Sequence, residues 1–154
     1  MEVKRCEELS PLVLDELIRV WEEAVRSSHY FLTEADIDFY RPRVRDIYFQ
    51  AVELYVIRDE RVSDAHGAEG GIVAFMGLSD DMVEMLFVLP SCQGKGYGSA
   101  LLRSAWQEKH IRKVDVNEDN AEAFRFYLNR GYRVVGRDAT DADGKPFPIV
   151  HLEK

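Results

Sequence analysis

The sequence has 154 residues, enough for one domain with its own core, and its 46% hydrophobic and 31% charged residues are typical of a globular protein. A formal net charge of −8 argues against general nucleic-acid binding, and no apolar run approaches the roughly 20 residues of a membrane span or resembles a signal peptide. The two cysteines are too few for a disulfide framework, so we expect a cytoplasmic protein that binds neither nucleic acid nor membrane.

The first half of the chain predicts three strands and two helices. Ser10 and Pro11 supply the N-cap and the first-turn proline of the first helix, whose apolar residues recur at helical spacing. Thr33 opens a second helix, which we expect to break near Pro42 and then to resume. The strands are expected at residues 1–7, 54–57 and 72–78, the last two on either side of a glycine-rich turn.

The second half predicts four more strands and two more helices. Residues 83–89 are almost continuously apolar, as in a strand covered on both faces. Asp119 and Glu122 resemble a capping box at the start of the last helix, and Gly131 ends that helix. The other elements are a helix at 98–109 and strands around 114–116, 132–135 and 149–152.

These elements define the fold class as α/β (α+β), with a mixed central sheet of about seven strands and helices on both faces. The order along the chain is β-α-α-β-β-β-α-β-α-β-β. We see neither an internal repeat nor a linker, so residues 1–154 are expected to form a single domain.

A glycine-rich loop between the strand at 83–89 and the helix at 98–109 is the most informative feature. Its glycines, Gly94, Gly96 and Gly98, allow backbone N–H groups to converge at a helix N-terminus, where an anion such as phosphate binds without a metal. The Walker loop requires a lysine between its last glycine and the following serine or threonine, whereas here Ser99 follows Gly98 directly. The dinucleotide fingerprint requires Gly-x-Gly-x-x-Gly, whereas the spacing here is Gly94-x-Gly96-x-Gly98. The pattern present is Gln93-x-x-Gly96-x-Gly98.

A second motif lies one strand further along the chain, Asn120-x-x-Ala123-Phe124-x-x-Tyr127-x-x-x-Gly131-Tyr132. Together the two motifs resemble those of the GNAT superfamily of acyl-CoA-dependent N-acyltransferases, and the resemblance covers nearly the whole chain in element order. Trp21 and the short segments at residues 28–32, 116–118 and 144–148 resemble the small bacterial YjaB-type members of that superfamily.

The resemblance implies an enzyme that moves an acetyl group from acetyl-CoA directly to a primary amine of a small molecule or of a peptide or protein. A non-catalytic acyl-CoA sensor or interaction module is the alternative. The residues that the resemblance assigns to coenzyme A are Phe87, Val88, Leu89, Gln93, Gly94, Lys95, Gly96, Tyr97, Gly98, Ser99, Asn120, Ala123 and Phe124. Among them, the backbone of Phe87, Val88 and Leu89 is expected to pair with pantetheine beside a strand bulge, and one N–H to polarise the thioester carbonyl.

Two protons must move in such a reaction. Tyr127 matches the family tyrosine that protonates the leaving thiolate, whereas the residue that takes the amine proton is left open. Glu84 is one candidate, because a carboxylate buried in an apolar strand would titrate closer to neutral pH. His29, which the resemblance puts with Phe31 in the acceptor pocket, is another, and His151 is a third. The acceptor and the oligomeric state, a homodimer included, stay open.

Overall fold

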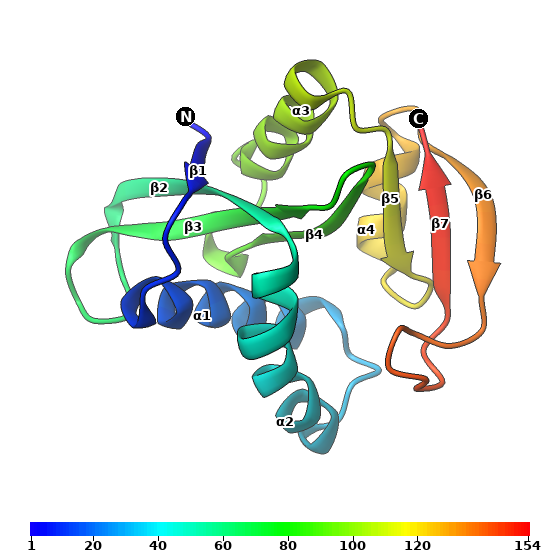
Figure 1. The fold of residues 1–154 in the computed structure, drawn as a ribbon, viewed down its shortest axis with the longest axis horizontal. Helices are drawn as coiled ribbons and strands as arrows, with labels where there is room; N and C mark the ends of the chain where they lie inside the picture. Colours follow the sequence, from blue (N-terminus) through cyan, green and yellow to red (C-terminus); the bar gives the residue numbers. More distant parts are fainter.

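A computed structural model describes residues 1–154 and contains one mixed sheet of seven strands, in the order β1-β2-β3-β4-β5-β7-β6. The strands pair antiparallel except for β4 and β5, which are parallel. This sheet confirms the predicted fold class and strand number (Figure 1). The strands are β1 (Lys4–Cys6), β2 (Glu53–Ser63), β3 (Glu69–Leu78), β4 (Met82–Val88), β5 (Lys113–Asn117), β6 (Arg133–Asp138) and β7 (Ile149–Glu153).

Helices cover both faces of this sheet, as predicted. Figure 1 shows α1 and α2 on one side of the strands and α3 on the other, with α4 behind β5. No helix combines the length and the apolar character that a membrane span needs. The helices are α1 (Pro11–Ser28), α2 (Glu34–Arg43), α3 (Tyr97–Lys109) and α4 (Ala121–Leu128), with a π-helical turn at Val44–Tyr48 and short 3₁₀ turns at Phe49–Ala51 and Pro90–Cys92.

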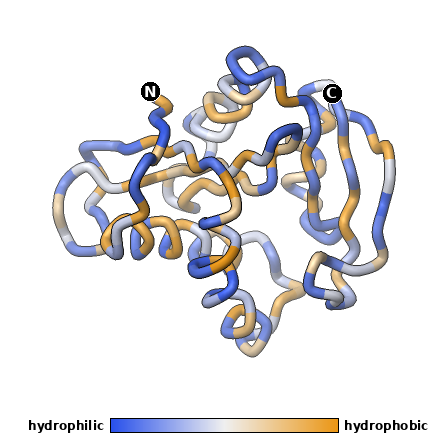
Figure 2. Tube along the Cα trace, in the orientation of Figure 1, coloured by the Kyte–Doolittle hydropathy of each residue, from blue (hydrophilic) through white to orange (hydrophobic).

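The hydrophobic core is centred on β3, where every residue from Gly71 to Leu78 is buried. One face of α1 packs on this strand through Leu17, Val20 and Val25, which are at most 2% exposed. Figure 2 shows the apolar colouring that runs along β3 through the middle of the sheet. The core therefore fixes the positions of the first four strands and, with them, the start of the loop that follows β4.

The sheet opens between β4 and β5. Their parallel pairing consists of Met82 with Lys113 and Val83 with Val114, and it goes no further. Directly after this point β4 contains a bulge, because Leu78 of β3 pairs with Val83 and Gly77 pairs with Met85, which leaves Glu84 as the extra residue. The bulge turns β4 away from β5, so a cleft forms between two neighbouring strands, as expected from the resemblance.

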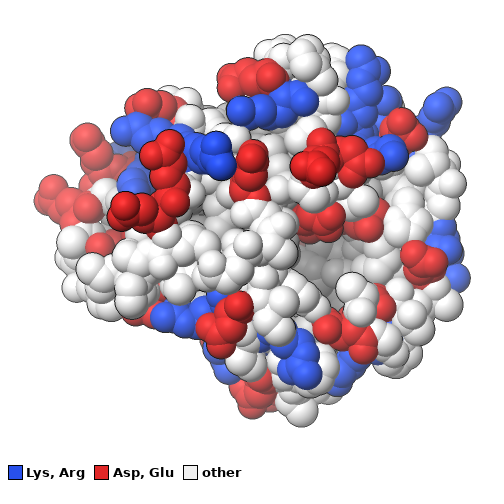
Figure 3. All heavy atoms as spheres, in the orientation of Figure 1, with Lys and Arg blue, Asp and Glu red and all other residues white.

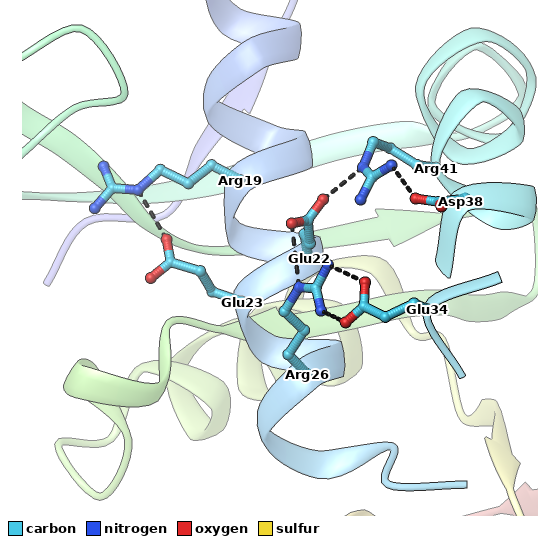
Figure 4. Close-up of polar contacts among 7 residues, drawn as sticks. All are labelled: Arg19, Glu22, Glu23, Arg26, Glu34, Asp38 and Arg41. Carbon is cyan, nitrogen blue, oxygen red and sulfur yellow. Dashed lines mark hydrogen bonds and ion pairs between the residues drawn. The ribbon is translucent and has the colours of Figure 1, made fainter. Parts of the chain in front are cut away.

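Charged side chains tie α1 to α2 (Figure 4). Glu22 accepts hydrogen bonds from Arg26 on its own helix, at 3.2 Å, and from Arg41 on α2. Arg26 also donates to Glu34 at the start of α2, with one contact of 3.0 Å. The capping box of Thr33 and Asp36, with N···O distances of 2.9 and 3.1 Å, fixes the first turn of α2 as predicted. These contacts hold α2 over the end of the sheet that opens.

Two local predictions are wrong. The second helix does not break at Pro42: it continues to Arg43 and then widens into the π-helical turn. Proline lacks the N–H that would bond to the carbonyl one turn earlier in the helix. The longer hydrogen-bond spacing of the π-helical turn that follows lets the chain stay helical past this point. The cap of α4 is Asn120, whose side chain accepts from the N–H of Ala123 at 3.3 Å, rather than Asp119.

Strand β4 also differs from the prediction, because it is not covered on both faces. Residues 85–88 are only half-buried and Glu84 is exposed. The apolar side chains there pack against the core and also line cavities, and this is where the functional site lies.

Candidate active site

The glycine loop forms as the sequence predicts. Gly94 and Gly96 have φ angles of +75° and +90°, a left-handed conformation that glycine adopts without strain. Gly96 is the N-cap of α3, so the free N–H groups of the first turn point away from the helix at this loop. Tyr97 links the turn to β2, because its hydroxyl donates to Asp59 of that strand at 2.6 Å. The side chain of Tyr97 is therefore a support for the loop, and its hydroxyl is already bonded within the protein.

A cavity of about 490 Å³ lies between this loop, β4 and α4. Its walls include most of the residues that the sequence assigned to coenzyme A: Phe87, Val88, Gln93, Gly94, Gly96, Tyr97, Gly98, Ser99, Asn120 and Ala123. Three assigned residues lie outside it. Leu89 is buried in the core, Lys95 is exposed, and Phe124 packs against the core from α4.

The cavity of about 490 Å³, which we call the loop cavity, fits a phosphate ligand in shape and in charge. A Cβ on Gly98 would meet the Phe126 ring at 3.5 Å and Val88 at 3.7 Å, so glycine keeps the cavity open beside the helix N-terminus. Arg130 contributes a guanidinium that sequence reasoning missed. Its Nη2 donates to Ser99 Oγ at 2.6 Å, and its Cζ lies 3.6 Å from the centre of the Phe126 ring. A signal existed, because Arg130 follows Tyr127 by three residues in the turn that ends α4, where its N–H donates to the carbonyl of Tyr127 at 3.0 Å.

The N–H of Val88 is a backbone donor of β4 that faces the open cleft. The N–H of Leu89 donates to the carbonyl of Val73 on β3 at 2.8 Å, so this N–H is already bonded within the protein. Successive N–H groups of a strand point to opposite edges. The N–H of Val88 therefore points toward β5, where the pairing has already ended at Val83.

Tyr127 lies where the loop cavity meets the cleft between β4 and β5. It lines both spaces and is 4% exposed. Burial raises the pKa of its hydroxyl well above the usual range, so the group keeps its proton at any physiological pH. The ring packs edge-on against Phe126 and Tyr132, with centroids 5.2 and 5.5 Å apart. A protonated phenol held in this way is suited to donate a proton.

A second, larger cavity of about 740 Å³ adjoins the first on the α2 side of the sheet. Its walls carry five carboxylates and no lysine or arginine: Glu84, Asp115, Asp138, Asp141 and Asp143. Figure 3 shows the hollow in this face of the molecule, with acidic side chains at its rim. We refer to this space as the acidic cavity.

His29 and Phe31 border the acidic cavity, where the sequence predicted the acceptor pocket. His29 also borders the loop cavity and the cleft, so it marks the junction of all three spaces. Burial lowers the pKa of His29 to about 4, which keeps the imidazole neutral at pH 7. Its Nδ1 is 2.8 Å from Ser28 Oγ, and its ring centre is 5.3 Å from that of Phe31.

Glu84 lies at the same junction, but as the exposed residue of the bulge. Its carboxylate accepts a hydrogen bond from Ser79 Oγ at 3.0 Å. The burial that would favour Glu84 as the base is absent, because the bulge turns its side chain out of the apolar run. His151, the third candidate for a base, stands between two carboxylates, with Nδ1 2.6 Å from Asp115 and Nε2 2.7 Å from Asp138.

The loop between β6 and β7 closes the outer side of the acidic cavity. Tyr40 on α2 donates to Asp141, and Tyr48 on the π-helical turn donates to Asp143. Phe147 packs on Phe31 with a centroid distance of 5.5 Å. The loop is thus tied to α2, and these contacts fix the width of the cavity.

Comparison with known proteins agrees with this geometry. The model of the acetyltransferase (GNAT) domain family matches residues 50–134. The peptidyl-lysine N-acetyltransferase YjaB of Escherichia coli is 31% identical over 141 residues, which is 90% of this chain and 88% of the relative. The solution structure of apo YjaB from Escherichia coli superimposes with a TM-score of 0.80 at 28% identity, covering 99% of this chain and 95% of that one. The PaiA N-acetyltransferase of Thermoplasma acidophilum, solved in complex with coenzyme A, shares the fold with a TM-score of 0.65 at 18% identity over both whole chains.

The two cavities, the glycine loop and the opened sheet together define an acyltransferase of the acyl-CoA-dependent class. The chain belongs to the GNAT acetyltransferase family. It is an N-acetyltransferase that takes its acetyl group from acetyl-CoA.

Proposed function

We propose that this enzyme acetylates the side-chain amine of lysine in peptides or proteins. The observation that carries this proposal is the acidic cavity, whose five carboxylates face no lysine or arginine in its walls. An alkyl amine with a pKa of about 10.4 arrives as a cation at neutral pH, so it is attracted by this field. The curated relative YjaB, named a peptidyl-lysine N-acetyltransferase, supports the same choice of acceptor.

The loop cavity is the proposed site of acetyl-CoA, which supplies an activated acetyl thioester. The N–H groups at the start of α3, the hydroxyl of Ser99 and the guanidinium of Arg130 hold its phosphates. The side-chain amide of Asn120 borders the same cavity while its oxygen caps α4. Two further residues assigned to coenzyme A lie outside this cavity: Lys95 is exposed, and Phe124 packs against the core.

The reaction takes place at the junction of the cavities. The N–H of Val88 faces the cleft and is the proposed donor to the carbonyl oxygen, where negative charge develops. Tyr127 is the proposed acid that protonates the leaving sulfur. His29 and Phe31 shape the entrance for the acceptor, and Glu84 is the carboxylate that the incoming cation meets there.

Acetyl transfer to a panel of amines tests the proposal. The panel contains a peptide with an internal lysine and a blocked N-terminus, the same peptide with arginine in place of lysine, a polyamine and an aminoglycoside. Mass spectrometry is expected to find acetyl on the lysine Nζ and none on the arginine peptide. Acetylation of the small amines alone would contradict the proposed acceptor, and tight acetyl-CoA binding without any product would favour a sensor.

A further inference from the structure

Asp115, His151 and Asp138 form a hydrogen-bonded trio on the floor of the acidic cavity, and the roles described so far leave it unused. The three come from neighbouring strands. Asp115 on β5 pairs in register with His151 on β7, and His151 pairs with Gly136 on β6, two residues before Asp138. All three side chains therefore lie on the same face of the sheet.

The geometry of the trio fixes the number of protons that it holds. Both ring nitrogens of His151 are within 2.7 Å of a carboxylate oxygen, and each such contact needs a proton between its two atoms. A neutral imidazole carries only one N–H. The trio therefore holds a second proton and has a net charge of −1 instead of −2.

The trio also leads from the reaction junction to solvent. Asp115 lines both the acidic cavity and the cleft beside Tyr127, and its side chain is 28% exposed. His151 is 32% exposed, and Asp138 at the outer end is 69% exposed. Gly136 leaves room for this arrangement, since a Cβ there would come within 3.3 Å of the imidazole ring.

The surrounding charges favour an extra proton at this place. Glu84 from β4 and Asp141 and Asp143 from the β6–β7 loop face the same cavity. The nearest cation on α2, Arg43, pairs with Asp143 at 3.9 Å. The hydrogen bond to Asp115, and then that to Asp138, raises the pKa of His151 above its ordinary value.

We propose that this trio accepts the proton of the acceptor amine and delivers it to solvent, an inference that rests on the proposed use of a charged amine. An N–H bond of the ammonium breaks, its proton goes to Asp115, and its electron pair stays on nitrogen as the nucleophile. Asp115, whose side chain is 28% exposed, then releases one proton to water, while His151 keeps a proton on each ring nitrogen and its positive charge offsets one of the two carboxylates. The trio has a charge of −1 before and after, so the step can repeat in each turnover. Asp115 is the catalytic residue of this step, and His151 acts through it.

The pH dependence of His151→Gln tests the proposal, because glutamine fills the site but cannot supply the positive charge that holds Asp115 as a carboxylate ready to accept the proton. Values of kcat/KM for the lysine peptide are measured from pH 6.5 to 10. We expect a loss of about 100-fold at pH 7 that shrinks to within about threefold at pH 10, where much of the amine is already free base. A loss of kcat/KM that is equal at all pH values, or no loss, would overturn the proposal.

Two matched variants sharpen this comparison. Asp143→Asn also removes one acid group from the acidic cavity but lies outside the trio, so its profile is expected to keep the wild-type shape. Glu84→Gln tests the competing base at the junction. If the deficit that depends on pH appears in Glu84→Gln and not in His151→Gln, Glu84 takes the proton and the trio does not.

A spectroscopic measurement decides the charge of the trio without turnover. In the wild-type protein, the ¹⁵N chemical shifts of the His151 ring at pH 7 are expected to be those of a doubly protonated imidazolium. A neutral ring in which only one nitrogen is protonated would overturn the proton count. Because this result does not depend on the acceptor, a failure of lysine peptides as substrates would contradict the proposed function and leave the trio to be judged by its own spectrum.

Discussion

Tyr127 is the residue on which the proposed chemistry depends most. Its buried hydroxyl keeps its proton and borders both the cleft and the loop cavity. We predict that Tyr127→Phe lowers kcat by about 100-fold, since the thiolate then leaves without a proton donor. Binding of acetyl-CoA, measured by calorimetry, is expected to change little.

The neighbouring Tyr132 provides the matched control. Its hydroxyl is buried without a hydrogen-bond partner, so Tyr132→Phe removes no bond and leaves stability unchanged or slightly higher. Its rate of acetyl transfer should equal that of the wild type. Equal rate losses in Tyr127→Phe and Tyr132→Phe would show that the loss comes from packing and not from proton donation.

His29 is predicted to make stability depend on pH. Its pKa is about 4 in the folded protein and about 6.5 when unfolded, so the unfolded chain binds more protons between these values. Stability is therefore complete above pH 6.5 and falls as the pH is lowered toward 4, by about 2 kcal/mol between pH 7 and pH 5. Urea unfolding of the wild type and of His29→Gln at both pH values measures the difference. The same decrease in both proteins would contradict a buried, neutral His29.

At the scale of elements, the glycine loop owes its function to backbone conformation. Gly96→Ala puts a side chain at a φ of +90°, and Gly67→Ala does the same at +86° in a turn far from either cavity. Each change is expected to lower the free energy of unfolding by about 1–2 kcal/mol. Only Gly96→Ala should also raise the Kd for acetyl-CoA, by about tenfold or more, because it reorients the N–H groups that face the phosphates. An unchanged Kd in Gly96→Ala would contradict the phosphate site.

The ion pairs between α1 and α2 set the position of one wall of the acidic cavity. Glu22 bonds two arginines, one on each helix, whereas Glu23 pairs only with Arg19 on α1 at 2.9 Å. Because these side chains are partly exposed, Glu22→Gln is expected to cost about 1 kcal/mol and Glu23→Gln less than about 0.5 kcal/mol. Thermal unfolding measures both. A raised KM for the amine in Glu22→Gln alone would link the helix contact to the cavity.

The elements themselves were largely predictable from the sequence, because they follow from local patterns. The cap at Ser10, the start of α2 after Thr33 and the glycine loop that leads into α3 were predicted correctly. A bulge in β4 was expected from the resemblance, but its position at Glu84 was not, since that position is set by register with β3, and register depends on residues far apart in the chain.

Many residues that line the loop cavity could be predicted from the sequence, whereas few residues that line the acidic cavity could be. The two motifs identified many residues in the walls of the loop cavity, although Arg130 was missed and Leu89 lies outside the cavity. The acidic cavity combines side chains from β4 to β7 and their loop. No short motif contains them, so only the fold shows that Asp115, His151 and Asp138 are neighbours.

At the scale of the whole molecule, the net charge of −8 and the five carboxylates of the acidic cavity act together on the acceptor. We predict that KM for a lysine peptide flanked by arginines rises several-fold when NaCl increases from about 0.05 to 0.5 M, since salt screens long-range attraction. A peptide with neutral flanks should show a smaller rise. The same salt effect on both peptides would mean that the cavity does not select for charge.

The most direct test of the account is the rate of acetyl transfer to a single lysine in a blocked peptide at pH 7, compared between the wild type and Tyr127→Phe. The account predicts acetylation of the lysine Nζ by the wild type and a rate about 100-fold lower in the variant. No acetylated lysine, or equal rates in the two proteins, would contradict it.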